Sequence, residues 1–232
     1  MGEDDTPVLS PRLTILVEVS AGVASRDEER LREIFERAAE WSAAAGAEFV
    51  DAMEEALVQT FLFLGYPAAL NALAVWREVG PPAPRPREAD VSTWTARGEE
   101  VCRRVYGTQY DGLRGNIAAL HPDLDRWMVD EGYGRVLGRP GLPLVERELC
   151  IVGILTVLGT SRQLYAHLRG ALRVGASPEE VAAAVGLALR YASADVEDIA
   201  RRTLEDVVSR HREAHTDDSN GGAPERGSRD VH

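Results

Sequence analysis

Three side chains between residues 144 and 174 have the types and spacing for acid–base chemistry. His167 and Gln163 are four residues apart in a segment with helical periodicity, so both lie on one face of the expected helix. Glu148 belongs to the preceding expected helix, from which its carboxylate can approach and orient the imidazole for proton transfer. We therefore name His167, Glu148 and Gln163 as candidate catalytic residues. The alternatives are a structural histidine and a glutamate that only complements the helix dipole.

Arginine is the cation available to bind a substrate, because all 26 lysine and arginine positions hold arginine. A guanidinium holds a carboxylate through two parallel hydrogen bonds. Arg139, Arg135 and Arg162 lie in the same stretch as the acid–base residues and are candidate substrate-binding residues, with Arg139 ranked first. Tyr133 is a further candidate, with core packing as its default role.

Five short strings in the second half of the chain form a pattern. They are Tyr133-Gly134-Arg135-Val136, Arg139-Pro140-Gly141-Leu142, Glu146-Arg147-Glu148-Leu149, His167-Leu168-Arg169-Gly170-Ala171-Leu172 and Gly175-Ala176-Ser177-Pro178-Glu179-Glu180-Val181. This pattern resembles the carboxymuconolactone decarboxylase family, which is related to the alkylhydroperoxidase D proteins. The resemblance runs from about Tyr106 to Leu204, and it implies an all-helical fold whose members form rings of subunits.

The chain departs from the peroxidase branch of that family. That branch carries a glutamate, a C-x-x-C pair and a histidine, and here Glu148 and His167 match while Thr160 and Gln163 stand at the two cysteine positions. Reduction of a peroxide by a dithiol needs a thiolate and a resolving thiol. The pattern therefore disfavours dithiol chemistry and leaves, as an alternative, an antioxidant protein that uses Cys150 with an external thiol.

The chain also departs from the decarboxylase branch. The resemblance would place a glutamate at residue 163 and a Gly-Tyr-Pro turn at residues 194–196, where this chain has Gln163 and Ala194-Asp195-Val196. A neutral amide forms hydrogen bonds but does not exchange a proton at ordinary pH. The substrate 4-carboxymuconolactone is therefore not fixed by the resemblance.

Periodicity and capping signals predict an all-α protein, because no segment sustains the alternation of a half-buried strand. Ser177-Pro178-Glu179-Glu180 is a capping box that starts one of the helices. Helices are expected near residues 10–24, 28–45, 48–64, 67–79, 96–119, 144–158, 161–174, 178–192 and 196–212.

Four segments are expected along the chain: a degenerate helical unit (8–80), a proline-rich connector (81–95), a carboxymuconolactone decarboxylase-like unit (96–212) and a disordered polar tail (213–232). The apolar pattern after Leu13 repeats after Leu149, although two alanine-rich amphipathic helices can also match by chance. The family resemblance implies that the repeat is a tandem duplication, with two related helical units and an alkylhydroperoxidase D-like fold. In this alignment Arg12 and Ala38 occupy the places of Glu148 and His167. The first unit should therefore serve as a wall and an oligomer support.

Composition excludes several partners. The net charge of -12 argues against binding to nucleic acid or to an anionic membrane, and two cysteines cannot build a cysteine-based zinc site. No apolar run reaches 18 residues and the start of the chain is acidic, so we expect a cytoplasmic protein without metal or cofactor.

The leading hypothesis is a cofactor-free lyase that performs acid–base chemistry on a small carboxylated, lactone-like substrate. Two alternatives remain: the thiol antioxidant described above, and a family scaffold without catalytic activity. Because the helices carry more apolar surface than one small core can cover, we also expect a homo-oligomer, which the ring architecture of the family would make a trimer.

Overall fold

The computed structural model describes residues 8–81 and 90–220. Within these residues the regular elements are all helices and no strand is present, which confirms the predicted all-α fold. The α-helices are α1 (Pro11–Ser25), α2 (Glu28–Ala45), α3 (Ala47–Gln59), α4 (Phe61–Val79), α5 (Trp94–Tyr106), α6 (Tyr110–Leu120), α7 (Pro122–Trp127), α8 (Leu144–Leu158), α9 (Ser161–Val174), α10 (Pro178–Leu189) and α11 (Ala194–Asn220). Two short 3₁₀ turns, η1 (Val91–Thr93) and η2 (Gly107–Gln109), and a π-helix, η3 (Met128–Leu137), complete the set.

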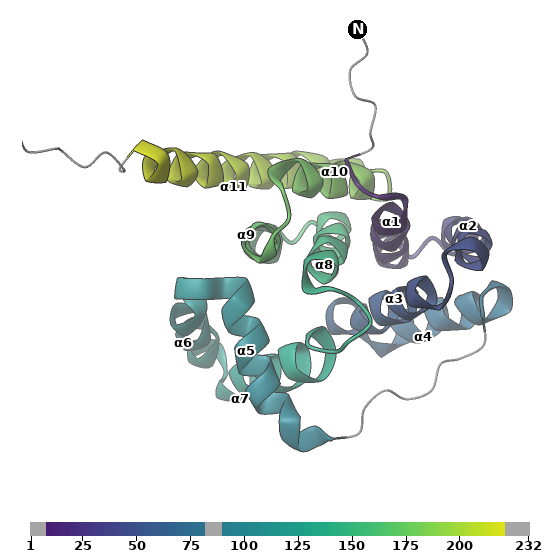
Figure 1. Ribbon diagram of the computed structural model, residues 1–232, viewed down its shortest axis with the longest axis horizontal. Coiled ribbons are helices and arrows are strands. Elements are labelled where there is room, and N and C mark those ends of the chain that lie inside the picture. The colour runs from purple at the N-terminus through teal and green to yellow at the C-terminus, as the bar shows by residue number, and fades with distance from the viewer. Residues whose placement is uncertain (1–7, 82–89, 221–232) are drawn as a thin grey trace, which may run out of the picture.

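The helices form three layers (Figure 1). The middle layer is a row in the order α9, α8, α1 and α2, in which each helix packs against the next. On one side of this row α10 packs on α8 and α1, while α11 packs on α9. On the other side α3 and α4 pack on α1 and α2, and α5 packs on α9. Helix α8 therefore lies in the centre of the molecule.

The two central helices, α1 and α8, are buried on all sides. Every residue from Leu16 to Ala24 and from Arg147 to Thr156 is buried. A helix that is apolar all round is stable only where neighbours cover every face. A charged side chain inside such a stretch needs a partner in the protein, because water cannot supply one there.

Local signals set several helix boundaries as predicted. Helices α8 and α9 have the predicted bounds. The capping box is present at the start of α10, where the Ser177 hydroxyl accepts a bond from the backbone N–H of Glu180 and the Glu180 carboxylate accepts one from the backbone N–H of Ser177. Two hydrogen bonds thus satisfy donors that the helix leaves unpaired.

Other boundaries differ from the sequence prediction. The helix expected over 96–119 is two helices, because Gly107 adopts a positive φ of 55° between α5 and α6. The helix expected over 48–64 ends at Gln59, and α4 begins at Phe61 with a kink at Gly65. The segment from Pro122 to Leu137, for which we predicted no helix, forms α7 and η3.

The C-terminal helix is longer than predicted. Helix α11 ends at Asn220, whereas we expected residue 212 and a disordered tail from residue 213. Ion pairs at i,i+4 spacing along this helix, such as Glu197 with Arg201 and Asp206 with Arg210, stabilise a polar helix that has little apolar surface. The rest of the predicted tail (221–232) and most of the predicted connector (82–89) lie outside the described residues.

Among the described residues no single helix has the length and apolar composition needed to cross a bilayer. Helices α3 and α4 meet those criteria only as a pair, and they are bent by 111° at their junction.

Candidate functional site

A buried carboxylate and a buried imidazole meet between α8 and α9. Glu148 Oε2 lies 2.9 Å from His167 Nδ1, the Glu148 side chain is fully buried, and the His167 side chain is 9% exposed. The approach of these two residues, which we predicted from the sequence, is therefore present. Their catalytic role stays a prediction.

This contact depends on a glycine in α9. A Cβ atom at Gly170 would stand 2.8 Å from Glu148 Oε2 and 2.7 Å from Val105 Cγ1, both closer than real Cβ contacts. Any larger residue at position 170 would displace the carboxylate or the α5 side chain. Gly170 therefore makes room for the acid beside the imidazole.

The hydrogen bond selects one form of the imidazole. An ionised carboxylate only accepts hydrogen bonds, so Nδ1 must carry the proton that is donated to Glu148. The other ring nitrogen, Nε2, has no hydrogen-bond partner among the described residues. Glu148 Oε1 is also buried without a partner, which leaves one carboxylate oxygen free to accept a further bond.

Glu148 influences the acidic groups that surround it. Burial first, and the negative charge of Glu148 in addition, raise the pKa of the Tyr106 and Tyr133 hydroxyls above their usual value. Burial, opposed by Arg114 and helped by Glu148, raises the pKa of the Cys102 thiol to about 12. The carboxylate therefore stands among neutral groups at physiological pH.

The first half of the chain supplies one wall of this site. The Phe63 ring in α4 meets the His167 ring edge-on, with ring centroids 5.8 Å apart and an interplanar angle of 80°. An aromatic ring in this arrangement limits how the imidazole can turn. The supporting role expected for the first unit stays a prediction.

The other predicted catalytic residue, Gln163, is not part of this contact. It is exposed near the start of α9 and forms no hydrogen bond with Glu148 or His167. Thr160, at the other position where the peroxidase branch has a cysteine, keeps a buried hydroxyl oxygen without a hydrogen-bond partner. The structure thus brings together two of the three predicted acid–base residues.

Arg139, the first-ranked substrate-binding candidate, is occupied by an acid of the protein. Its guanidinium donates to both carboxylate oxygens of Glu55 at 3.0–3.2 Å. The fully buried Arg147 donates to Glu55 at 2.9 Å, to the Arg139 carbonyl at 3.0 Å and to Gln59 at 3.4 Å. This cluster ties α3 to α8 and leaves Arg139 with a structural contact.

The remaining candidates are separate from one another. Arg135 pairs with Glu131 at 3.5 Å and lies over the Trp94 ring. Arg162 is exposed on the first turn of α9. Tyr133 is buried, and its hydroxyl donates to the Tyr106 hydroxyl at 3.1 Å. Of the three candidate arginines, Arg162 is the one for which the structure shows no acidic partner.

Both cysteines are fully buried. Burial raises the pKa of Cys150 to about 12, as it does for Cys102, so neither thiol forms a thiolate readily at neutral pH. Cys150 lies in the core that contains α1 and α3. This environment does not suit the proposed antioxidant use of Cys150.

Four cavities of about 320–510 Å³ lie in the described part of the chain. His167 is not among the residues that line them, although its neighbour Ala166 and the Tyr106 side chain line one of about 320 Å³. These four cavities therefore do not provide a pocket at His167. Within residues 8–81 and 90–220 no group of three or more His, Cys, Asp or Glu side chains is placed to hold a metal ion.

Comparison with known proteins identifies relatives of this chain. Residues 122–206 match the model of the carboxymuconolactone decarboxylase family. A Schizosaccharomyces pombe protein called peroxisomal protein 2 is 29% identical over 188 residues, which cover 78% of this chain and 86% of the relative. Glu148, Gly170 and His167 all lie inside the family match.

Proposed function

We propose that this chain, whose residues 122–206 match the model of the carboxymuconolactone decarboxylase family, is a cofactor-free lyase acting on a small carboxylated, lactone-like substrate. The observation that carries the proposal is the buried hydrogen bond between Glu148 and His167. A buried acid beside an imidazole whose Nε2 is free is the arrangement required for directed proton transfer.

The chemistry follows from this geometry. When the bond between the substrate carbon and its carboxyl group breaks, carbon dioxide leaves and the electron pair remains on an enolate-like carbon. His167 in its protonated form gives the Nε2 proton to that carbon, and the Glu148 carboxylate stabilises the imidazolium before this step. Water then restores the proton. In this proposal Arg162 holds a second acidic group of the substrate, because Arg139 is held by Glu55.

The test is turnover of 4-carboxymuconolactone, followed by carbon dioxide release. Replacement His167→Gln should lower kcat by about 10²-fold or more, the size expected for loss of a general acid. Replacement His121→Asn is the matched control, because His121 is an exposed N-cap residue of α7 and asparagine also caps helices. Equal activity in both variants, with equal thermal midpoints, would contradict the assignment. Activity lost together with folding would show a structural histidine.

We propose further that the two halves are related helical units with one active site per chain. In support, α1 and α8 both have 15 residues. The helix contacts also correspond: α1 packs on α2 and α3, and α4 packs on both of these, while α8 packs on α9 and α10, and α11 packs on both of those. Arg12 and Ala38 stand in the first half where the second has its acid and its imidazole. Calorimetric titration with a substrate analogue should give one site per chain, and two equal sites would refute this.

The chain is proposed to assemble as a homo-oligomer, with a trimer as the expected form. The support is the exposed face of α4, where Tyr66 and Leu70 are 57% and 60% exposed on the helix whose first turn carries Phe63. Light scattering should give three times the chain mass of 25.3 kDa. Replacement Leu70→Glu should lower that mass, whereas Leu120→Glu, on an exposed site of α6, should leave it unchanged. A monomer at micromolar concentration would contradict the proposal.

A further inference from the structure

Helix α9 carries a second row of polar residues on the side away from His167. Tyr165, Arg169 and Arg173 follow one another at intervals of four residues, so they form one stripe along the helix. Tyr165 and Arg169 are each two residues from His167, which places them about 200° around the helix from it. The stripe therefore faces a different part of the molecule from the Glu148–His167 contact.

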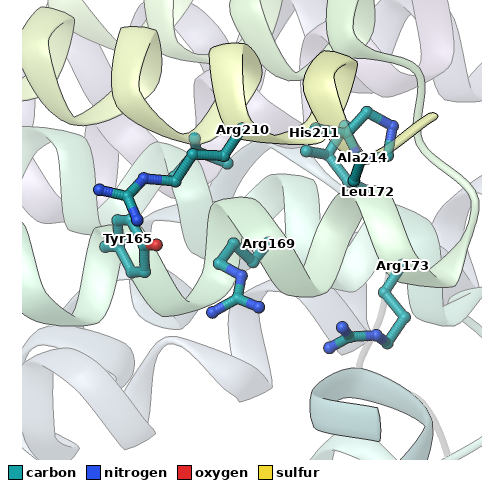
Figure 2. A pocket seen from close by; sticks show the side chains of 8 residues that line it. Tyr165, Arg169, Leu172, Arg173, Arg210, His211 and Ala214 are labelled. Carbon is teal, nitrogen blue, oxygen red and sulfur yellow. The ribbon is translucent and has the colours of Figure 1, made fainter. Parts of the chain in front are cut away.

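This stripe lines a cavity of about 510 Å³ between α9 and α11. Leu172 and Val207 give the cavity an apolar wall, and Arg210 reaches into it from α11. Figure 2 shows Tyr165, Arg169 and Arg173 one after another along α9, with Arg210 extending from α11 to the side of Tyr165. A neighbouring cavity of about 320 Å³, toward α5 and α6, shares Tyr165, Arg169 and Arg173. The two cavities share these three side chains, and together we call them the α9 groove.

The charge of the α9 groove is opposite to that of the whole protein. Three arginines and no acidic residue line its two cavities, in a chain with a net charge of -12. Arg210 pairs with Asp206 at 2.7 Å, but the structure gives Arg169 no carboxylate partner and places its guanidinium 5.7 Å from the centre of the Tyr165 ring. Such a concentration of guanidinium groups attracts anions.

Arg173 is held in place by backbone carbonyl oxygens and not by an acidic side chain. Its Nη1 donates to the carbonyl oxygens of Val105 and Tyr106 at 3.3 and 2.7 Å. These bonds also pair carbonyl groups in the last turn of α5, so the side chain is fixed before any ligand arrives. Its other nitrogens remain able to donate to a ligand. A fixed cation loses little conformational freedom on binding.

We propose that the α9 groove binds an elongated organic molecule with an apolar body and two anionic groups. One anionic group is bound by Arg169 and Arg173, the other by Arg210, and the apolar body lies against Tyr165 and Leu172. The chemistry is shared by dicarboxylates and by organic bisphosphates, because a guanidinium binds both kinds of oxyanion through paired hydrogen bonds. This site is separate from the proposed active site and does not depend on the proposed lyase activity.

Isothermal titration of the full chain with two six-carbon probes tests the proposal. The probes are adipate and hexane-1,6-diyl bisphosphate, and hexanoate is the control with a single charge. At least one dianion should bind, about tenfold or more tighter than hexanoate, and affinity should fall as salt is raised. The dianion that binds more tightly identifies the anionic group. Absence of binding by both dianions at millimolar concentration, or equal binding of hexanoate, would overturn the proposal.

Two variants locate the binding. Replacement Arg169→Gln should weaken binding of the preferred dianion about tenfold, as expected when one charge-assisted contact is lost. Replacement Arg202→Gln is the matched control, because Arg202 lies on α11 in an exposed i,i+4 pair with Asp198, the same kind of pair that Arg210 makes with Asp206, but outside the groove. It should leave the affinity unchanged. Equal loss in both variants would show a general charge effect and overturn the assignment to the groove.

Discussion

The close contact between α9 and Glu148 makes Gly170→Ala a sharp test of the site geometry. Alanine favours a helix over glycine by about 0.8–1.0 kcal/mol, so the change would stabilise the protein at an open position. At position 170 the new methyl group would meet Glu148 Oε2 at 2.8 Å and Val105 Cγ1 at 2.7 Å. Neither atom can withdraw easily, because Glu148 is fully buried and Val105 is 1% exposed.

The second glycine needed for a matched comparison lies in α10. A Cβ atom at Gly186 would meet nothing within 4 Å, and Gly186 is exposed within the helix. Because the gain in helix propensity is common to both replacements, the difference between Gly170→Ala and Gly186→Ala isolates the cost of overpacking. That cost is about 1–3 kcal/mol. For a chain of this length it corresponds to a difference of about 2–12 °C between the two thermal midpoints.

Differential scanning calorimetry or thermal circular dichroism of the three proteins measures this difference. We expect Gly186→Ala to unfold at or above the temperature of the parent chain and Gly170→Ala well below Gly186→Ala. Equal midpoints for the two variants would show that α9 does not approach Glu148 as closely as described. In that case the argument that Gly170 makes room for the Glu148–His167 contact would be wrong.

Four further predictions concern stability and the thiols. Replacement Arg147→Met should lower the free energy of unfolding, measured by urea titration, by about 3–5 kcal/mol, because it removes one partner of the buried Glu55 carboxylate. The double replacement Arg147→Met, Glu55→Gln should recover part of this loss in the same assay. Replacement Ser177→Ala removes the N-cap of α10 and should cost about 1 kcal/mol in the same assay. Cys102 and Cys150 should resist a thiol reagent at pH 7.5 until the chain is unfolded. Burial raises the pKa of each thiol from 9.0 to about 12, so the folded state keeps protons that the unfolded state releases above pH 9. The free energy of unfolding should therefore fall as pH rises from 9 toward 12. An unchanged free energy of unfolding over this range would contradict the prediction.

The sequence was most informative where a local signal ends a helix. Gly175 and the Ser177-Pro178 cap mark the end of α9 and the start of α10, and both boundaries are where they were predicted. The break at Gly107 was missed, because a helical sequence pattern does not reveal whether a single glycine within it adopts a positive φ. The π-helix η3 was missed because an apolar period of 3.6 residues does not describe it.

The candidate site shows the same division between local and distant information. Glu148 and His167 lie 19 residues apart on adjacent antiparallel helices, so their contact followed from two helix predictions. The partner of Arg139 is Glu55, 84 residues away, and no spacing rule connects them. Phe63, which contacts His167, also comes from the first half. Contacts between the two halves depend on the tertiary fold, and a single sequence does not reveal them.

The central position of α1 has a consequence for synthesis of the chain. Helix α1 is complete at Ser25, but its partner α8 begins only at Leu144. At about 5–20 residues per second the ribosome needs roughly 6–24 s to make the chain between them. During that time the apolar side of α1 that packs on α8 in the folded protein remains uncovered. We therefore expect the nascent first half to need a chaperone, and to aggregate when translation stops before α8 has emerged.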